Sequence, residues 1–414
     1  MGKQKQKRLH YRSIDVLRTC SLLEMVVVHF IDYLSSAEVF WGVYVPCFGA
    51  PMFLFLSGIC YHIGIESQLR LLSKNDGDGM RTVRWKFVKR GACLCIVGAV
   101  IVATSQFLTV ALECDAIVTS GLMQIVLAVF FWEKSSGFLI FANLSVILVT
   151  PVIRDVATTD VYWDYENFEI RYPDPEHYYT LLDVIKLHLV AGYFPLFPYA
   201  SFSILGLLVG RVLVPRYSSS NCNEYKDKDM NHMNHRASRV RNISMFGAAL
   251  YGIGKWLGRI NSDHAYLGGW TTYQLTFPSC VGKTGRVLMW FGIVSYVVDF
   301  CMHKKGKGAI TAVTASRTTS LLDHIVGRYS KAPLTIYFLH SAVIFWPLRF
   351  VGWLYDKDDW WEEYARDVLE EWQASALGLF FIFFMYFLLG WIDQWQLPRI
   401  EHALQWLCNL NSSS

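Results

Sequence analysis

Long uncharged segments constrain the fold of this chain more than any other feature. Residues 194–209 and 376–390 contain no charged side chain, and only 17% of all residues are charged, whereas soluble domains have about 25%. A run of about 18 or more apolar residues crosses the hydrocarbon layer of a membrane as a helix. The sequence therefore predicts an all-α integral membrane protein, a bundle of about ten transmembrane helices.

The charges between the apolar segments indicate how they are oriented. Segments 70–90, 211–241 and 303–331 are basic, whereas 154–190 and the residues after 355 are acidic. Cytoplasmic segments carry the excess of Lys and Arg, so this alternation places both termini in the cytoplasm. The predicted spans are residues 14–34, 41–63, 90–111, 115–132, 137–153, 192–213, 242–258, 284–302, 333–354 and 375–394.

The chain is predicted to form one membrane domain with two short tails. Residues 1–13 are a basic cytoplasmic tail, 14–394 the transmembrane domain, and 395–414 a second cytoplasmic tail. Residues 154–191 are predicted to form an outer loop and 214–241 a cytoplasmic linker, of which the polar stretch 217–239 is expected to be flexible. A span follows the basic tail at once, so the tail is interpreted as an orientation signal and not as a nucleic-acid site. Membrane lipid is the expected surrounding, in a plasma membrane or an endomembrane.

The first span carries ionisable residues, which are costly inside a membrane and commonly face a partner or a wet cavity. At 100° per residue, Asp15, Arg18, His29 and Asp32 fall within an arc of about 100°, while Glu24 points away from it. Structural explanations exist for each residue: an intrahelical Asp15–Arg18 pair, a solvated Asp32, and a His29 bonded between helices. Their alignment on one face favours a functional role.

The spacing within this stripe suits acid–base chemistry. His29 and Asp32 are three residues apart and share a helix face, so the carboxylate is able to fix the imidazole tautomer and leave the other nitrogen as a base. Arg18 and His29 are separated by about 16 Å of helical rise. A cationic group near the cytoplasm and a base deeper in the membrane suit a long cofactor with phosphates at one end, which is the shape of coenzyme A.

Five stretches resemble a known family in the same order. The segments S-I-D-V-L-R at 13–18 and M-V-V-V-H-F-I-D at 25–32 resemble the first span of the transmembrane acyltransferase superfamily. The resemblance is greatest to the heparan-alpha-glucosaminide N-acetyltransferase catalytic-domain family, and the acyltransferase-3 O-acyltransferases are wider relatives. The chain has Thr19 where that family has Gly. The other stretches are P-M-F-L-F-L-S-G at 51–58, Asp115 with G-L-M-Q at 121–124, Y-F-P-L-F-P-Y at 193–199 with G-L-L-V-G at 206–210, and P-L-T-I-Y-F-L-H at 333–340.

The resemblance implies acyl transfer from cytoplasmic acyl-CoA, with acetyl-CoA as the expected donor, to a saccharide amine or hydroxyl on the other side. His29 would be the catalytic base or the acyl carrier, with Asp32 beside it. Asp15, Asp115 and His340 would orient the substrates, although His340 is equally explained as a structural hydrogen-bond donor. The candidate residues for coenzyme A are Arg18, Arg84, Lys89, Arg90 and Gln124, of which the basic ones also serve orientation.

Two other classes of function fit parts of the pattern. A proton-coupled transporter or permease would use His29 and Asp32 as a proton relay, but transporters commonly show paired broken helices, and only one Pro-rich break, near 195–198, is present. A structural or sensing membrane protein is the third class. The ten cysteines show no spacing typical of a metal site, so no metal is expected. The oligomeric state is open, including a homodimer.

Overall fold

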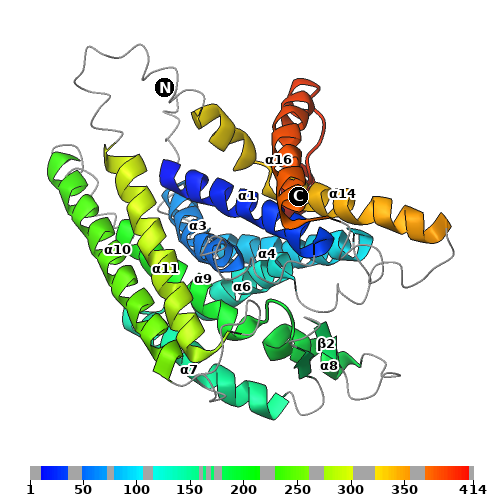
Figure 1. Cartoon of the computed structure of the whole chain (residues 1–414). Helices are drawn as coiled ribbons and strands as arrows, with labels where there is room; N and C mark the ends of the chain where they lie inside the picture. The colour runs from blue at the N-terminus through cyan, green and yellow to red at the C-terminus, as the bar shows by residue number, and fades with distance from the viewer. Residues whose placement is uncertain are drawn as a thin grey trace.

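The computed structural model is a helical bundle (Figure 1), and it describes residues 11–35, 49–71, 79–105, 115–157, 162–164, 169–171, 180–214, 229–260, 275–301, 322–354 and 369–409. The helices are α1 (Arg12–Leu34), α3 (Ala50–Leu71), α4 (Gly79–Ser105), α6 (Ala116–Phe130), α7 (Ser136–Ala157), α8 (Leu181–Lys186), α9 (Leu196–Leu213), α10 (Asp229–Ile260), α11 (Phe277–Ser295), α14 (Pro333–Leu354), α16 (Glu371–Gln394) and α17 (Ile400–Asn409). Two π-helical turns, η1 (Leu187–Ala191) and η3 (Tyr296–Cys301), extend α8 and α11. The antiparallel strands β1 (Tyr162–Asp164) and β2 (Glu169–Arg171) form a small hairpin.

Five of the described helices are long and apolar enough to cross a membrane, which fits a helical membrane protein. They are Gly79–Thr104, Ser136–Arg154, Leu196–Leu213, Pro333–Val351 and Glu371–Gln394. Each of the ten predicted spans overlaps a helix of the structure, although 41–48, 106–111 and 302 lie outside the described residues.

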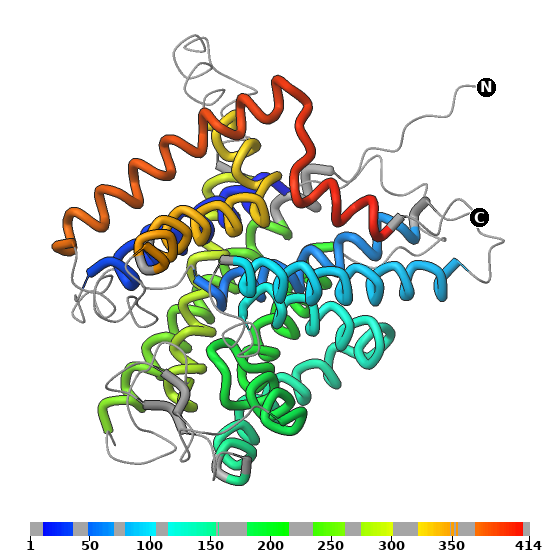
Figure 2. The backbone as a smooth tube through the Cα atoms, turned by 90° about the vertical axis from the view of Figure 1, so that its right-hand side faces the viewer, coloured from blue at the N-terminus to red at the C-terminus, as the bar shows by residue number. Residues whose placement is uncertain are grey.

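Helix α1 lies near the middle of the bundle. It contacts α3, α11, α14 and α16, and Figure 2 shows α16 running beside α1 and α14. One core cluster joins Leu17 of α1 to Phe55, Phe202 and Phe291 of neighbouring helices. A second cluster joins the C-terminal half of α1 to α14 and α16. The polar stripe of α1 is thus enclosed by other helices rather than exposed on the surface.

The close contact between α3 and α9 depends on glycine. A Cβ atom built on Gly206 would overlap the carbonyl oxygen of Phe55, and one built on Gly58 would overlap that of Ser203. Small residues allow the backbones of membrane helices to approach in this way. Ser203 adds a hydrogen bond of 3.0 Å from its hydroxyl to the Leu54 carbonyl oxygen. This contact holds α3, which forms one wall of the cavity described below.

Several segments that were predicted to be loops are helical. Residues 81–90 belong to α4, and the linker 214–241 is helical from Asp229, where α10 begins. The tail 395–414 contains α17. Residues 229–239 of the segment that was predicted to be flexible thus form the start of α10. The physical reason is that residues 80–90 and 229–246 contain no Gly or Pro, so the exposed polar turns continue the helices of their apolar neighbours.

Candidate functional site

A cavity of about 750 Å³ lies between the helices that carry most of the candidate residues. Side chains of α1, α3, α4, α6, α9, α10, α11, α14 and α17 line it. The α1 side chains on its lining are Arg18, Leu22, Glu24, Met25, Val28 and His29. Pockets that hold a small-molecule ligand commonly have volumes of about 300–1,000 Å³. The cavity is thus large enough for a substrate.

His29 and His340 meet where α1 faces α14. His29 Nδ1 lies 2.7 Å from His340 Nε2, and His340 Nδ1 lies 3.2 Å from the Ile336 carbonyl oxygen one turn earlier. A carbonyl oxygen only accepts hydrogen bonds, so we assign the proton of the neutral His340 ring to Nδ1 and an acceptor lone pair to Nε2. His29 then donates from Nδ1. Its Nε2 therefore keeps the lone pair that a base requires.

A tyrosine and an aspartate extend this pair towards α6. The Tyr337 hydroxyl donates to Asp115 Oδ1 at 2.5 Å, and the Tyr337 ring packs edge-on against His340, with centroids 5.2 Å apart. Asp115 also caps α6, because its Oδ2 accepts from Ile117 N at 3.0 Å. Asp115 and His340 are thus brought into one network from α6 and α14. The carboxylate fixes the Tyr337 side chain that lies against the histidine pair.

Gln124 presents a polar atom to the same cavity. Its side chain is 8% exposed and lines the cavity, and its Oε1 has no hydrogen-bond partner within the described part of the chain. Buried polar atoms are nearly always bonded, so such an atom at a cavity wall favours a ligand that donates to it. The Ser57 and Ser120 hydroxyls, 3.2 Å apart, lie on the same lining.

The arginine of the polar stripe is held by three neighbours. Arg18 donates to Asp15 Oδ1 at 3.1 Å, to the Ser330 carbonyl oxygen at 3.4 Å and to Cys60 Sγ at 3.1 Å. Asp15 and Arg18 therefore form the intrahelical pair that the sequence left open, yet Arg18 still lines the cavity.

The structure separates the other basic candidates. Arg90 lines the cavity, as does Lys331, whereas Lys89 is exposed and is not placed on the lining. Arg84 donates to the Ala128 and Val129 carbonyl oxygens at 2.8 and 2.7 Å. It thereby caps the C-terminal end of α6. The cavity thus gathers Arg18 and Arg90, while Arg84 and Lys89 lie elsewhere.

Two positions differ from the helical-wheel expectation for α1. Glu24, which the wheel pointed away from the polar stripe, lies on the cavity lining, whereas Asp32 is not placed there. His340, rather than Asp32, is the group that the structure places against Nδ1 of His29. A helical wheel gives the angles between side chains of one helix, but it does not show which neighbouring helices surround them. The cavity contacts α1 over a wider arc than the roughly 100° of the polar stripe, so it also reaches Glu24.

Some lining residues were not identified from the sequence. Tyr337 was part of a quoted motif without a role, and Lys283 and Arg286 of α11 were not singled out. Both cations lie in a largely apolar helix, which is a signal of function in membrane segments. The predicted span began at residue 284 and so left Lys283 outside it. Basic side chains outnumber acidic ones among the described lining residues, so the cavity favours an anionic ligand.

Comparison with known families gives one match. Residues 10–241 match the family described as heparan-alpha-glucosaminide N-acetyltransferase, catalytic. The match covers more than half of the 414 residues and contains His29, Asp115 and Gln124. It ends before α14, so His340 and Tyr337 lie outside it. No curated protein matches the chain.

Proposed function

The chain belongs to the heparan-alpha-glucosaminide N-acetyltransferase catalytic family, as the five motifs predicted, and from this membership we propose that it transfers an acetyl group from acetyl-CoA to an amine or hydroxyl of a saccharide. The family makes it a membrane transferase, and the donor, the acceptor group and the roles of the residues are the proposed part. The observation that carries the proposal is the contact of 2.7 Å between His29 Nδ1 and His340 Nε2, with His29 on the lining of the cavity.

His29 serves as the general base in this proposal. Its Nε2 takes the proton from the acceptor amine or hydroxyl as the acceptor atom attacks the thioester carbonyl carbon. The bond from that carbon to sulfur breaks, and the coenzyme A thiolate leaves with the electron pair. The protonated His29 then returns the proton to the thiolate, so the ring ends the cycle neutral. His340 supports the charged state by accepting the bond from Nδ1 throughout.

The basic side chains on the lining and the spacing of Arg18 and His29 support acetyl-CoA as the donor. Arg18 and Arg90 would hold the phosphates, and the helical rise of about 16 Å from Arg18 to His29 would be spanned by the arm that ends in the thioester. Gln124 would accept a hydrogen bond from an amide N–H of that arm, which would satisfy its buried oxygen. Asp115 would contribute by holding the Tyr337 side chain against His340. The catalytic role of Asp32 stays a prediction.

The proposal includes an orientation in the membrane. Ten spans with both termini in the cytoplasm would place Arg18 near the inner surface and His29 nearer the outer one. The donor would then enter from the cytoplasm, and the acceptor would bind on the extracytoplasmic side. This orientation rests on the alternation of basic and acidic segments.

The test uses the full chain, purified in detergent, with acetyl-CoA labelled in the acetyl group and glucosamine as acceptor. Acetylglucosamine is expected with the wild-type chain and not with His29→Gln. His188→Gln is the matched control, because His188 of η1 contacts the Val184 carbonyl oxygen of α8 and is not among the described residues that line the cavity. The proposal is wrong if His29→Gln keeps full activity. It is also wrong if the chain neither binds nor consumes acetyl-CoA with any acceptor but moves a solute with protons in proteoliposomes.

A further inference from the structure

The first turn of α14 is capped by a residue of α17. Glu401 Oε1 accepts from the backbone N–H groups of Leu334 and Thr335 at 2.6 and 3.0 Å, and Oε2 accepts from the Thr335 hydroxyl at 2.7 Å. The Thr335 oxygen in turn accepts from Ile400 N at 3.2 Å. The first N–H groups of a helix have no acceptor within the helix, and a carboxylate there is favoured by the helix dipole. Glu401 thus supplies from a distant segment what a local cap normally supplies.

The capped turn leads directly to the site. Tyr337 and His340 follow Thr335 by two and five residues in the same helix. A helix whose first turn is held at two N–H groups and one hydroxyl has its height and rotation fixed at that end. The distance of 2.7 Å between His340 Nε2 and His29 Nδ1 depends on both. Glu401 itself lies on the cavity lining but does not contact either histidine ring in any described hydrogen bond.

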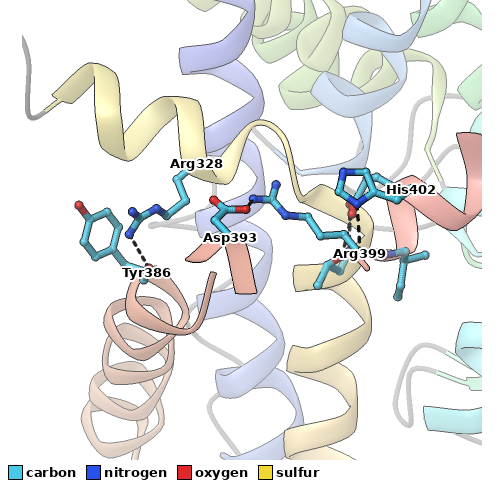
Figure 3. A network of polar contacts seen from close by, with 8 residues as sticks. Arg328, Tyr386, Asp393, Arg399 and His402 are labelled. Atoms are coloured by element: carbon cyan, nitrogen blue, oxygen red, sulfur yellow. Dashed lines mark hydrogen bonds and ion pairs between the residues drawn. The ribbon is translucent and has the colours of Figure 1, made fainter. Parts of the chain in front are cut away.

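The segment that carries Glu401 is anchored to α16. Arg399, which is 7% exposed, forms an ion pair with Asp393 at the end of α16. The backbone N–H of Arg399 donates to His402 Nδ1 at 3.4 Å. Figure 3 shows these residues along one line, together with the bond of 2.9 Å from Arg328 to the Tyr386 carbonyl oxygen. Helix α16 packs against α1, the helix of His29. One continuous path of contacts therefore joins α1 through α16 and α17 to α14.

We propose that Glu401 is a positioning residue for the His29–His340 pair, a role that rests on the proposed acyl transfer. Through this carboxylate, α17 holds α14 at the height at which His340 meets His29. The residue lies outside the part of the chain that matches the family, residues 10–241. The other cavity-facing residues of α17, Leu404, Gln405 and Cys408, form the adjacent wall.

The experiment compares Glu401→Ala with Glu370→Ala. Glu370 also caps a helix, since it forms a capping box with Gln373 at the start of α16, but it does not line the cavity. A misplacement of about 1 Å costs up to about a hundredfold in rate, so Glu401→Ala is expected to lower kcat about ten- to a hundredfold with the KM for acetyl-CoA unchanged. Glu401→Gln should recover most of the rate, because its amide oxygen still accepts from the two N–H groups. Glu370→Ala should keep the wild-type kcat.

A second readout does not depend on acyl transfer. Diethyl pyrocarbonate acylates neutral imidazoles, and the modified peptide containing His29 is quantified by mass spectrometry. Glu401→Ala is expected to change the rate at His29, while Glu370→Ala keeps the wild-type rate. If the wild-type chain transfers no acetyl group but this difference persists, the proposed function fails and the positioning role stands.

Equal kcat and equal modification of His29 in Glu401→Ala and Glu370→Ala would overturn the proposal and leave Glu401 as a cap only. If Glu401→Ala does not fold, Thr335→Val decides the question. This variant removes only the hydroxyl that Glu401 Oε2 and Ile400 N contact. A lower kcat at unchanged KM supports the proposal, and unchanged kcat overturns it.

Discussion

Replacing His340 with Phe removes the acceptor for the Nδ1 proton of His29 while keeping a ring of similar size beside Tyr337. In the wild-type structure the two nitrogens are 2.7 Å apart, and His340 is fully buried at 0% exposure. In the variant, the His29 N–H would face carbon atoms. This state is unfavourable, so the imidazole is expected to rotate or to carry its proton on Nε2 instead. Nε2 is the atom that must act as the base.

The size of the effect follows from the cost of a buried donor without an acceptor, about 1–3 kcal/mol. If this cost appears in the barrier of the chemical step, kcat falls about 5- to 150-fold. Loss of the base itself, as in His29→Gln, should cost more, because general base catalysis contributes about 10²- to 10⁴-fold. His340→Gln should fall between the wild type and His340→Phe, since its amide oxygen reaches close to the position of Nε2.

The assay is the initial rate of acetyl transfer to glucosamine at saturating acetyl-CoA, with melting temperatures in detergent as the control for folding. The expected order of kcat is wild type, His340→Gln, His340→Phe and His29→Gln. The assigned tautomer would be refuted if His340→Phe kept a wild-type kcat, or if His340→Gln were no better than His340→Phe in folded protein.

Three further predictions concern the cavity rim and the bundle. Arg90→Ala is expected to raise the KM for acetyl-CoA about tenfold, through loss of one charge-assisted bond, while Lys89→Ala leaves it unchanged because Lys89 does not line the cavity; equal KM values would contradict this. Arg84→Met should lower the melting temperature in detergent without changing KM, since this residue holds two carbonyl oxygens at the end of α6; a changed KM would instead indicate donor binding. Gly206→Ala should abolish the monodisperse peak in size-exclusion chromatography, because its Cβ would overlap a backbone oxygen of α3. Gly252→Ala should keep that peak, because a Cβ at Gly252 has no described atom within 4 Å. A folded Gly206→Ala variant would show that α3 and α9 are able to separate.

The residues that the sequence identified share one property, which is that their signal is local. His29 stands out because an ionisable side chain is unusual in an apolar span, and Asp115 and Gln124 belong to a short motif that resembles the family; each lies in the network or on the cavity of the structure. Charge near a span was less informative. Among the basic candidates, Arg18 and Arg90 face the cavity, while Arg84 caps a helix. All of them look alike in sequence, because a basic residue near a membrane surface serves orientation as well as binding.

Periodicity also reached its limit at the ends of helices. The apolar runs predicted the C-terminal parts of α4 and α10, but the polar turns at their N-terminal ends were taken for loops. Hydropathy indicates whether a segment lies in the membrane or in water. A helix, in contrast, continues past the membrane surface until a residue such as Gly or Pro ends it. The same limit concealed α17, whose sequence is short and mixed in polarity.

By itself, the sequence determined that this chain is a membrane protein with a histidine-bearing first helix, and it indicated the family that residues 10–241 then matched. These conclusions depend on the hydrophobicity of single segments and on motifs within them, which need no knowledge of neighbours. Only the tertiary structure decided that His29 Nδ1 meets His340, 311 residues away, and that Glu401 caps the helix carrying that partner. Such pairings depend on how helices far apart in the chain pack side by side, and no local pattern of residues specifies that distance.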